Sequence, residues 1–220
     1  MPAEIPICAL NSPSIEYSFR SKNKNNFKKI AERTHFTYRE VEALGVIHRK
    51  ILRTCGPINR SILRDIFHSG FDFTENKRHQ HIDRLFAVID KTNSLQIRMD
   101  HWIEALSIIL RGTLDERINF AYKVYDLLRT NRLRKEQMFP MMRGCLIAHL
   151  PDEDPDDGVK DLIELMIKKL DVDRDGFVSE NDFRTAVKER GEFFLECMGP
   201  VFPSREAQHA FLTTFTDNVE

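Results

Sequence analysis

The sequence predicts an all-α fold in which paired helix–loop–helix units build two lobes, followed by a C-terminal helix. Three segments share one spacing of apolar residues: an amphipathic helix, an aspartate, an apolar loop residue, and an apolar residue that opens a second helix. One such unit cannot bury its own apolar face, so the units are expected to associate in pairs. The composition agrees, because 41% of the 220 residues are hydrophobic, a fraction close to the globular range.

The N-terminal segment, residues 1–35, is predicted to be flexible and basic. Residues 1–26 are rich in Pro, Ser, Asn and Lys, a composition that does not favour a packed core. Residues 20–53 contain ten lysines and arginines against three glutamates, whereas residues 150–189 contain thirteen acidic side chains against six basic ones. This asymmetry indicates either two surfaces with different partners or two solvated faces of opposite sign.

The first lobe is predicted over residues 36–110. Its second unit follows the repeat closely, whereas its first unit fits if the loop is one residue shorter. Thr37 and Glu40 give the first helix of this lobe a capping box. The apolar positions are Leu44, Ile47, Ile51, Ile58 and Leu63 in the first unit, and Ile82, Leu85, Phe86, Ile89, Ile97 and Trp102 in the second.

The second lobe is predicted over residues 113–190. Its apolar positions are Ile118, Ala121, Tyr122, Tyr125, Leu133 and Met138 in the third unit, and Ile163, Met166, Ile167, Leu170, Val178 and Phe183 in the fourth. Leu133 and Val178 both stand at loop position 8, counting the aspartate as position 1. We therefore expect these two residues to pair the neighbouring loops as a short two-stranded ladder.

The loop from Asp171 to Asp182 has the residues needed to bind a divalent cation. The repeat is that of the EF-hand, whose 12-residue loop supplies oxygen ligands from positions 1, 3, 5, 7, 9 and 12 and has glycine at position 6. The predicted ligands are Asp171, Asp173, Asp175, Phe177 through its carbonyl, Ser179 and Asp182, with Gly176 at the turn. Asp182 replaces the usual glutamate, and its shorter side chain predicts weaker calcium binding and better tolerance of Mg²⁺.

The other three loops have lost this ligand pattern. The first has no acid, and in the third, residues 126–137, Asp126 is the only carboxylate at a ligand position. In the second, residues 90–101, the substituted positions are Thr92, Ser94, Leu95 at the turn glycine, and His101. A zinc site at His79, His81 and His101 is the weaker interpretation, because surface histidines are far commoner. No nucleophile constellation or phosphate-binding glycine loop is present, so no enzyme activity is predicted.

Two features near the predicted metal loop allow alternative interpretations. Arg132 and Arg134 of the third loop could offset the carboxylates of the fourth at low calcium, or they could point to solvent. Five of the seven methionines lie beyond Thr113 and could line a groove for a partner helix or fill the core. These methionines are Met138, Met141, Met142, Met166 and Met198.

The tail, residues 191–220, is predicted to contain a helix that begins after Ser204 and packs on a lobe. The four cysteines form no CxxC pair, and no signal peptide or apolar span is present, so we expect reduced thiols and an intracellular, cytoplasmic protein. Pro2 stands where myristoylation needs glycine, which argues against a membrane anchor. The net charge of −1 gives no indication of nucleic-acid binding.

Several stretches resemble the calaxin family, axonemal relatives of the neuronal calcium sensors. They lie at residues 110–117, 153–161, 168–171 and 195–200, and the likeness is looser over residues 34–79. The resemblance implies a calcium-responsive protein of motile cilia and sperm flagella, associated with outer-arm dynein and its docking apparatus. The family also keeps ligands in its two middle hands, which this sequence has lost. The alternatives are a cytosolic sensor of the neuronal-calcium-sensor type and a regulatory subunit of a phosphatase or kinase.

Overall fold

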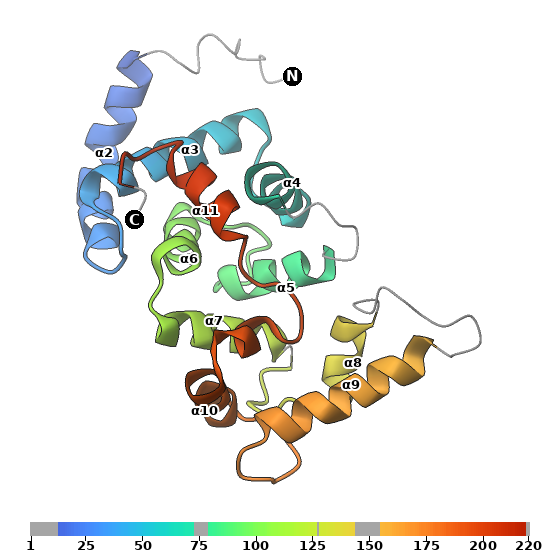
Figure 1. The fold of residues 1–220 in the computed structure, drawn as a ribbon. Helices are drawn as coiled ribbons and strands as arrows, with labels where there is room; N and C mark the ends of the chain where they lie inside the picture. Colours follow the sequence, from blue (N-terminus) through green and yellow to red (C-terminus); the bar gives the residue numbers. More distant parts are fainter. Residues whose placement is uncertain (1–12, 73–78, 127, 144–154, 219–220) are drawn as a thin grey trace.

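The computed structural model describes residues 13–72, 79–126, 128–143 and 155–218, whose helices form two lobes (Figure 1). The predicted all-α EF-hand architecture is confirmed within these residues. The elements are α2 (Pro13–Ala31), α3 (Tyr38–Thr54), α4 (Arg60–Phe71), α5 (His79–Ile89), α6 (Met99–Arg111), α7 (Leu114–Tyr125), α8 (Lys135–Met142), α9 (Pro155–Leu170), α10 (Glu180–Arg190), the 3-10 helix η2 (Glu192–Glu196) and α11 (Arg205–Leu212). Pro2, Cys8 and Cys145 lie outside the described residues.

The first lobe pairs the unit α3–α4 with the unit α5–α6. The capping box that starts α3 is formed, because the Glu40 carboxylate accepts a hydrogen bond of 2.8 Å from the Thr37 amide. The amide of Ile97 donates to the carbonyl of Ile58 at 2.8 Å, which joins the two loops at their apolar loop residues. The first unit therefore takes the repeat frame despite its shorter loop.

Helix α2 differs from the expectation of a flexible N-terminal segment. Residues 13–31 are helical, and the side chains of Phe27 and Ile30 are fully buried. Phe27 packs against Gly45 of α3, where an added Cβ would lie 2.6 Å from the Phe27 ring. Over residues 13–31 the prediction of flexibility is wrong, because a few widely spaced apolar side chains are enough to stabilise a helix that packs on a neighbouring one. Residues 1–12 of the predicted flexible segment lie outside the described residues.

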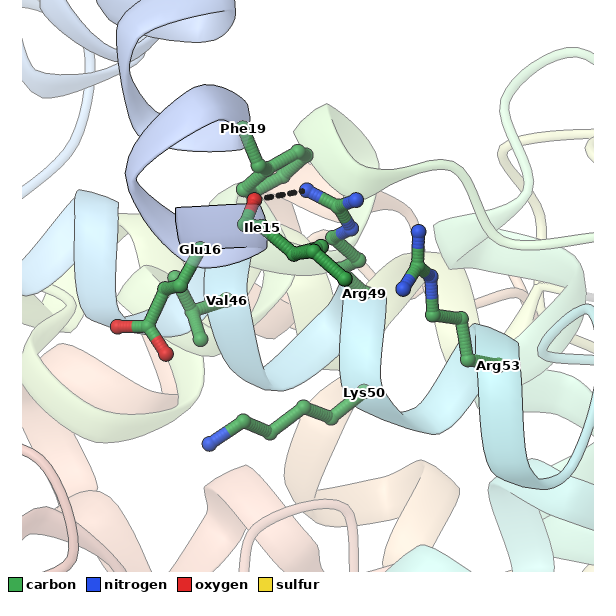
Figure 2. A pocket seen from close by; sticks show the side chains of 7 residues that line it. All are labelled: Ile15, Glu16, Phe19, Val46, Arg49, Lys50 and Arg53. Carbon is green, nitrogen blue, oxygen red and sulfur yellow. Dashed lines mark hydrogen bonds between the residues drawn. The ribbon is translucent and has the colours of Figure 1, made fainter. Parts of the chain in front are cut away.

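The N-terminal half of α2 is held against α3 by aromatic and charged contacts. The guanidinium of Arg49 lies over the Phe19 ring, 4.4 Å from its centroid, and donates to the carbonyl of Ile15 (Figure 2). Arg20 forms ion pairs with Glu16 of its own helix and with Glu42 of α3. A small pocket between the two helices is lined by Ile15, Glu16, Phe19, Val46, Arg49, Lys50 and Arg53.

The second lobe pairs the unit α7–α8 with the unit α9–α10. Leu133 and Val178 form an antiparallel bridge with two backbone hydrogen bonds of 2.9 and 3.1 Å, so the predicted loop pairing is confirmed. The hydroxyl of Tyr122 on α7 also donates to the Val178 carbonyl at 2.9 Å. Burial, followed by the nearby acidic groups, raises the pKa of Tyr122, which keeps the hydroxyl a donor.

The methionines of the second half of the chain fill the core. Met138, Met141, Met142, Met166 and Met198 are all buried. They belong to the hydrophobic cluster that runs through both lobes. Of the two interpretations of these residues, core filling is the one that this structure supports, and the methionines do not line an open groove.

The tail leaves the second lobe and runs back to the first (Figure 1). We call residues 191–203 the strap. The hydroxyl of Tyr125 on α7 hydrogen-bonds the carbonyls of Leu195 and Gly199, at 3.1 and 2.7 Å. The ring of His81 on α5 hydrogen-bonds the carbonyl of Met198 at 3.2 Å. The strap is therefore hydrogen-bonded to both lobes, and α11, which follows it, packs against α4.

We expect Gly199→Ala to destabilise the fold more than Gly191→Ala. Both glycines have a left-handed φ, of 125° and 111°, which costs a substituted residue about 1–3 kcal/mol. Only at Gly199 would the new methyl group also collide with the His81 ring, whereas nothing lies within 4 Å of a Cβ at Gly191. Urea unfolding of both variants checks this difference, and equal losses would contradict the packing of the strap against α5.

Candidate metal centre

The predicted metal loop connects α9 to α10 and wraps around three aspartates. Carboxylate oxygens of Asp171, Asp173 and Asp175 all lie within 4.8 Å of one another. Arg174 and Gly176 have left-handed φ values of 62° and 88°, which turn the loop between these side chains. Glycine adopts this conformation without steric cost, and the structure leaves open space around its α-carbon.

Backbone amides of the loop orient the three carboxylates. Asp171 accepts from the amides of Arg174, at 2.7 Å, and Gly176, at 3.0 Å. The Asp173 carboxylate accepts from the Asp175 amide at 3.1 Å, and the Asp175 carboxylate accepts from the Phe177 amide at 2.9 Å. Each carboxylate oxygen has more than one lone pair, so these bonds fix the side chains and leave acceptor capacity for a cation.

Asp182, at loop position 12, lies outside the group of three aspartates. It is buried as the third residue of α10, and its carboxylate accepts from both the amide, at 3.0 Å, and the hydroxyl of Ser179. Ser179 in turn caps the helix by accepting from the Asp182 amide at 3.1 Å. Binding an ion through Asp182 therefore requires this carboxylate to turn towards the loop centre or α10 to shift inward.

The charges of the loop favour a cation at its centre. At Asp173 a hydrogen bond from the Asp175 amide lowers the pKa, but burial and the negative charges of Asp182, Asp175 and Asp171 together raise it above its ordinary value. Close carboxylates repel one another, and a bound divalent ion relieves that repulsion. Hard oxygen donors in this number and spacing fit calcium or magnesium.

The two arginines of the third loop pack on the side chain of Phe177. The guanidinium carbons of Arg132 and Arg134 lie 5.4 and 4.9 Å from its ring centroid. Among the described residues no ion pair joins either arginine to a loop aspartate, so the structure does not support the hypothesis that they neutralise the carboxylates directly. They instead hold the residue whose carbonyl occupies loop position 7.

The second and third loops keep the backbone of an EF-hand loop without its ligands. Positions 4 and 6 are left-handed in both, as they are in the fourth loop; the residues are Asn93 and Leu95 in the second loop and Arg129 and Asn131 in the third. Loss of the turn glycine at Leu95 therefore does not abolish the turn, contrary to what its side chain suggests. The strain of a branched residue with φ of 61° must be offset locally.

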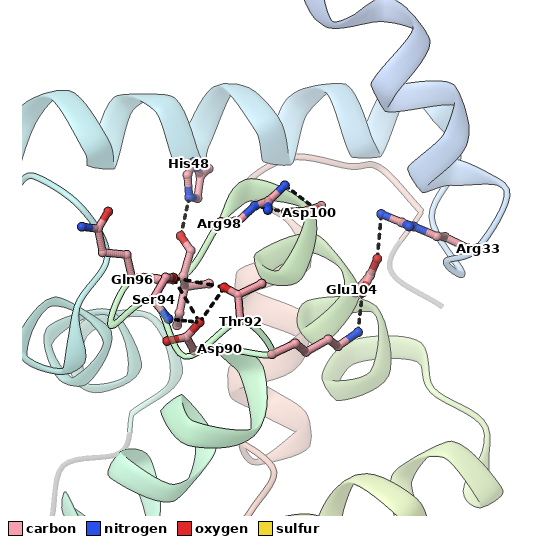
Figure 3. A network of polar contacts seen from close by, with 11 residues as sticks. Arg33, His48, Asp90, Thr92, Ser94, Gln96, Arg98, Asp100 and Glu104 are labelled. Atoms are coloured by element: carbon pink, nitrogen blue, oxygen red, sulfur yellow. Dashed lines mark hydrogen bonds and ion pairs between the residues drawn. The ribbon is translucent and has the colours of Figure 1, made fainter.

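In the second loop Asp90 supplies that offset (Figure 3). Its buried carboxylate accepts from the amides of Ser94, at 3.2 Å, and Leu95, at 2.8 Å, and from the hydroxyls of Thr92 and Ser94. Burial alone raises the pKa of Asp90, but these hydrogen bonds outweigh it and lower the pKa. The loop thus uses its own donors where a metal would otherwise bind.

Asp126 closes the third loop in the same way. It accepts from the amides of Thr130, at 3.1 Å, and Asn131, at 2.7 Å. The sequence predicts only that these two loops have lost the ligand pattern, although the Thr or Ser residues that follow Asp90 and Asp126 are a signal of internal hydrogen bonding. No metal-ligand group of the described residues includes a histidine, so nothing in these ranges supports a zinc site.

The comparisons with known proteins agree with this geometry. A family model described as an EF-hand domain pair matches residues 115–188. Calaxin of Xenopus laevis is 37% identical over 200 residues, which cover 86% of this chain and 94% of the relative. Calaxin of Danio rerio is 37% identical over 183 residues, covering 80% and 85%, and calaxin of Homo sapiens is 37% identical over 154 residues, covering 70% and 71%.

The paired helix–loop–helix units and the acidic fourth loop define a calcium-binding regulatory protein of the EF-hand class. Similarity along most of the chain narrows this class further: the chain belongs to the calaxin family.

Titration calorimetry should find at most one calcium site, with a Kd on the order of 10⁻⁵ M or weaker. Asp171→Ala should abolish binding, because Asp171 is bonded to two loop amides and is one of the three clustered carboxylates. Asp182→Glu should tighten binding, since the extra methylene shortens the movement required of α10. Asp126→Ala is the matched control and should leave the isotherm unchanged. Two or more tight sites in the unmodified protein would contradict this assignment.

Asp126→Ala should lower stability equally in chelator and in saturating calcium. The substitution leaves the amides of Thr130 and Asn131 without their acceptor, a loss of about 1–3 kcal/mol that does not depend on an ion. Thermal unfolding under the two conditions measures both losses. In the same assay Asp171→Ala should lower the stability more in calcium than in chelator, because the substitution also removes the stabilisation by bound metal. A loss at Asp126 that appears only with calcium would assign metal to the third loop.

Proposed function

We propose that this protein is a calcium-responsive adaptor of the ciliary or flagellar axoneme, associated with outer-arm dynein or its docking complex. The main support is the similarity to calaxin along 86% of the chain. The resemblance to this family implies an axonemal setting. The cluster of Asp171, Asp173 and Asp175 adds support, because it gives the chain one loop through which calcium can act. The role is regulatory rather than catalytic.

In this function the fourth loop would hold the ion through its side-chain and backbone oxygens. The proposed ligands are the side chains of Asp171, Asp173, Asp175, Ser179 and Asp182 and the carbonyl of Phe177. Calcium supplies positive charge at the centre of the loop. The protein's own contribution is to hold the carboxylates close before the ion arrives and to keep Asp182 on a helix that can shift.

Helix α10 is the element through which the loop can influence the rest of the chain. Its side chains Arg184 and Lys188 both form ion pairs with Asp115 at the start of α7, at 2.6 and 2.7 Å. The strap begins directly after α10 at Gly191. A displacement of α10 towards the ion therefore acts on α7 and on the tail together.

No helix of the described residues has the length and apolar character needed to cross a bilayer.

A cytosolic sensor of the neuronal-calcium-sensor type and a regulatory subunit of a phosphatase or kinase are the alternatives that the binding experiment must separate.

Affinity capture from demembranated sperm or ciliated epithelium should recover outer-arm dynein heavy chains or docking-complex proteins. Capture is carried out with calcium and with chelator, and mass spectrometry identifies the bound proteins. The Asp171→Ala variant serves as a control: its capture pattern in calcium should match that of the unmodified protein in chelator. Enrichment of a phosphatase or kinase without axonemal proteins would replace the proposed function with the regulatory-subunit alternative.

A further inference from the structure

A row of positively charged side chains lines the pocket between α2 and α3. Three basic residues of α3 follow Val46 at spacings of three, four and seven residues, so they share its helix face. They are Arg49, Lys50 and Arg53, and we call them the cationic row. Lys50 and Arg53 are exposed, and Figure 2 shows the guanidinium groups of Arg49 and Arg53 pointing the same way from α3.

The acidic side chain that lines this pocket, Glu16, is already paired. Arg20 of α2 forms an ion pair with Glu16 and a second one, at 2.9 Å, with Glu42 of α3. Within the described part of the chain no ion pair joins the cationic row to an acidic side chain. Burial, followed by the positive charge of Arg53, lowers the pKa of Arg49. The row therefore lacks a counter-charge of its own.

The C-terminal end of α3 does not explain the whole row. The partial negative charge of a helix end attracts cations only within the last turn, which accounts for Arg53 but not for Arg49 or Lys50. The Arg49 guanidinium is also held in position, because it lies over the Phe19 ring and donates to the Ile15 carbonyl. That bond uses one of the five N–H donors of an arginine, so Arg49 is oriented and still able to bind an anion.

The pocket has the size and lining of a subsite for one acidic side chain. Its volume of about 20 Å³ gives room for one or two water-sized groups, comparable to a carboxylate. Ile15, Phe19 and Val46 form an apolar wall, and Glu16 interrupts the positive charge at the edge. A continuous chain of phosphates or a charged lipid surface would meet the Glu16 carboxylate, whereas a short acidic segment with an apolar side chain can avoid it.

We propose that the pocket between α2 and α3 is a docking site for an acidic segment of a protein partner. An aspartate or glutamate carboxylate of that segment binds between Arg49 and Arg53, because guanidinium groups recognise carboxylates through a fork of donors. Lys50 pairs with a second carboxylate, and an apolar side chain of the segment packs on Ile15. The inference rests on the proposed function only for the existence of a protein partner, and it names the chemistry that this partner presents.

The test uses the full chain and a fluorescent peptide of repeated Glu-Glu-Leu units, with binding measured by fluorescence anisotropy at physiological ionic strength. Lys50→Glu/Arg53→Glu should weaken binding at least tenfold. Lys28→Glu/Lys29→Glu is the matched control, because it reverses the same number of exposed charges on α2 outside the pocket lining, and it should change binding less than twofold. Arg49→Lys, which keeps the charge and loses the fork, should weaken binding at least threefold. A peptide of Gln-Gln-Leu units should not bind.

Equal weakening by the two double variants would overturn the proposal, because the attraction would then reflect overall charge. Tighter binding of single-stranded RNA or of phosphatidylserine vesicles than of the peptide would also overturn it. A dimer that sedimentation detects and that Lys50→Glu/Arg53→Glu abolishes would assign the pocket to a second copy of this chain instead of a partner.

Circular dichroism verifies that each variant is folded. Should the double variant in the cationic row unfold, carbodiimide cross-linking of the unmodified chain decides, since this reagent joins a carboxylate to an amine in contact with it. The peptide must then become attached to Lys50 in preference to Lys28 and Lys29, and even labelling rejects the site. Failed peptide binding would leave the axonemal capture result standing, and failed capture would leave the peptide result standing.

Discussion

The antiparallel bridge between Leu133 and Val178 determines the shape of the second lobe. Both side chains are fully buried, and the Val178 carbonyl accepts from the Leu133 amide and from the Tyr122 hydroxyl. Each such bond contributes about 1 kcal/mol net, and together they fix the fourth loop at its eighth position. The ligand-poor third loop therefore supports the metal loop, because its Leu133 is the bridge partner of Val178.

The loops that hold themselves together without a metal ion are different from the loop that can respond to one. Asp90 and Asp126 hold their loops in the EF-hand conformation through amides of the same loop, so those loops need no ion to be formed. Within the described part of the chain, the fourth loop is the only one that brings several carboxylates together, and its final acid, Asp182, is hydrogen-bonded to Ser179. A calcium response, if confined to this loop, acts on a molecule whose other three hands are already folded.

The repeat frame could be read from the sequence because it depends on local spacing. A period of 3.6 residues places apolar side chains on one helix face. Position 8 places Ile97, Leu133 and Val178 between paired loops, and Ile58 takes the equivalent place in the shorter first loop. The contacts that were missed depend on residues far apart in the chain. Phe27 becomes a core residue because Gly45 leaves room for its ring. The direction of Arg132 and Arg134 likewise depends on Phe177, which belongs to the neighbouring hand.

The strap also has a chemical consequence. Cys197 lies within it, between the carbonyl of Leu195 and that of Met198, to which Tyr125 and His81 bond. Burial raises the pKa of the Cys197 thiol to about 12, so in this packed arrangement almost none of it is thiolate at neutral pH. Lifting the strap from α5 and α7 would return the thiol to water and to ordinary reactivity. Because Cys197 is only partly buried in this arrangement, the reactivity of its thiol depends on how the strap packs, and a change in that packing would alter its rate of alkylation.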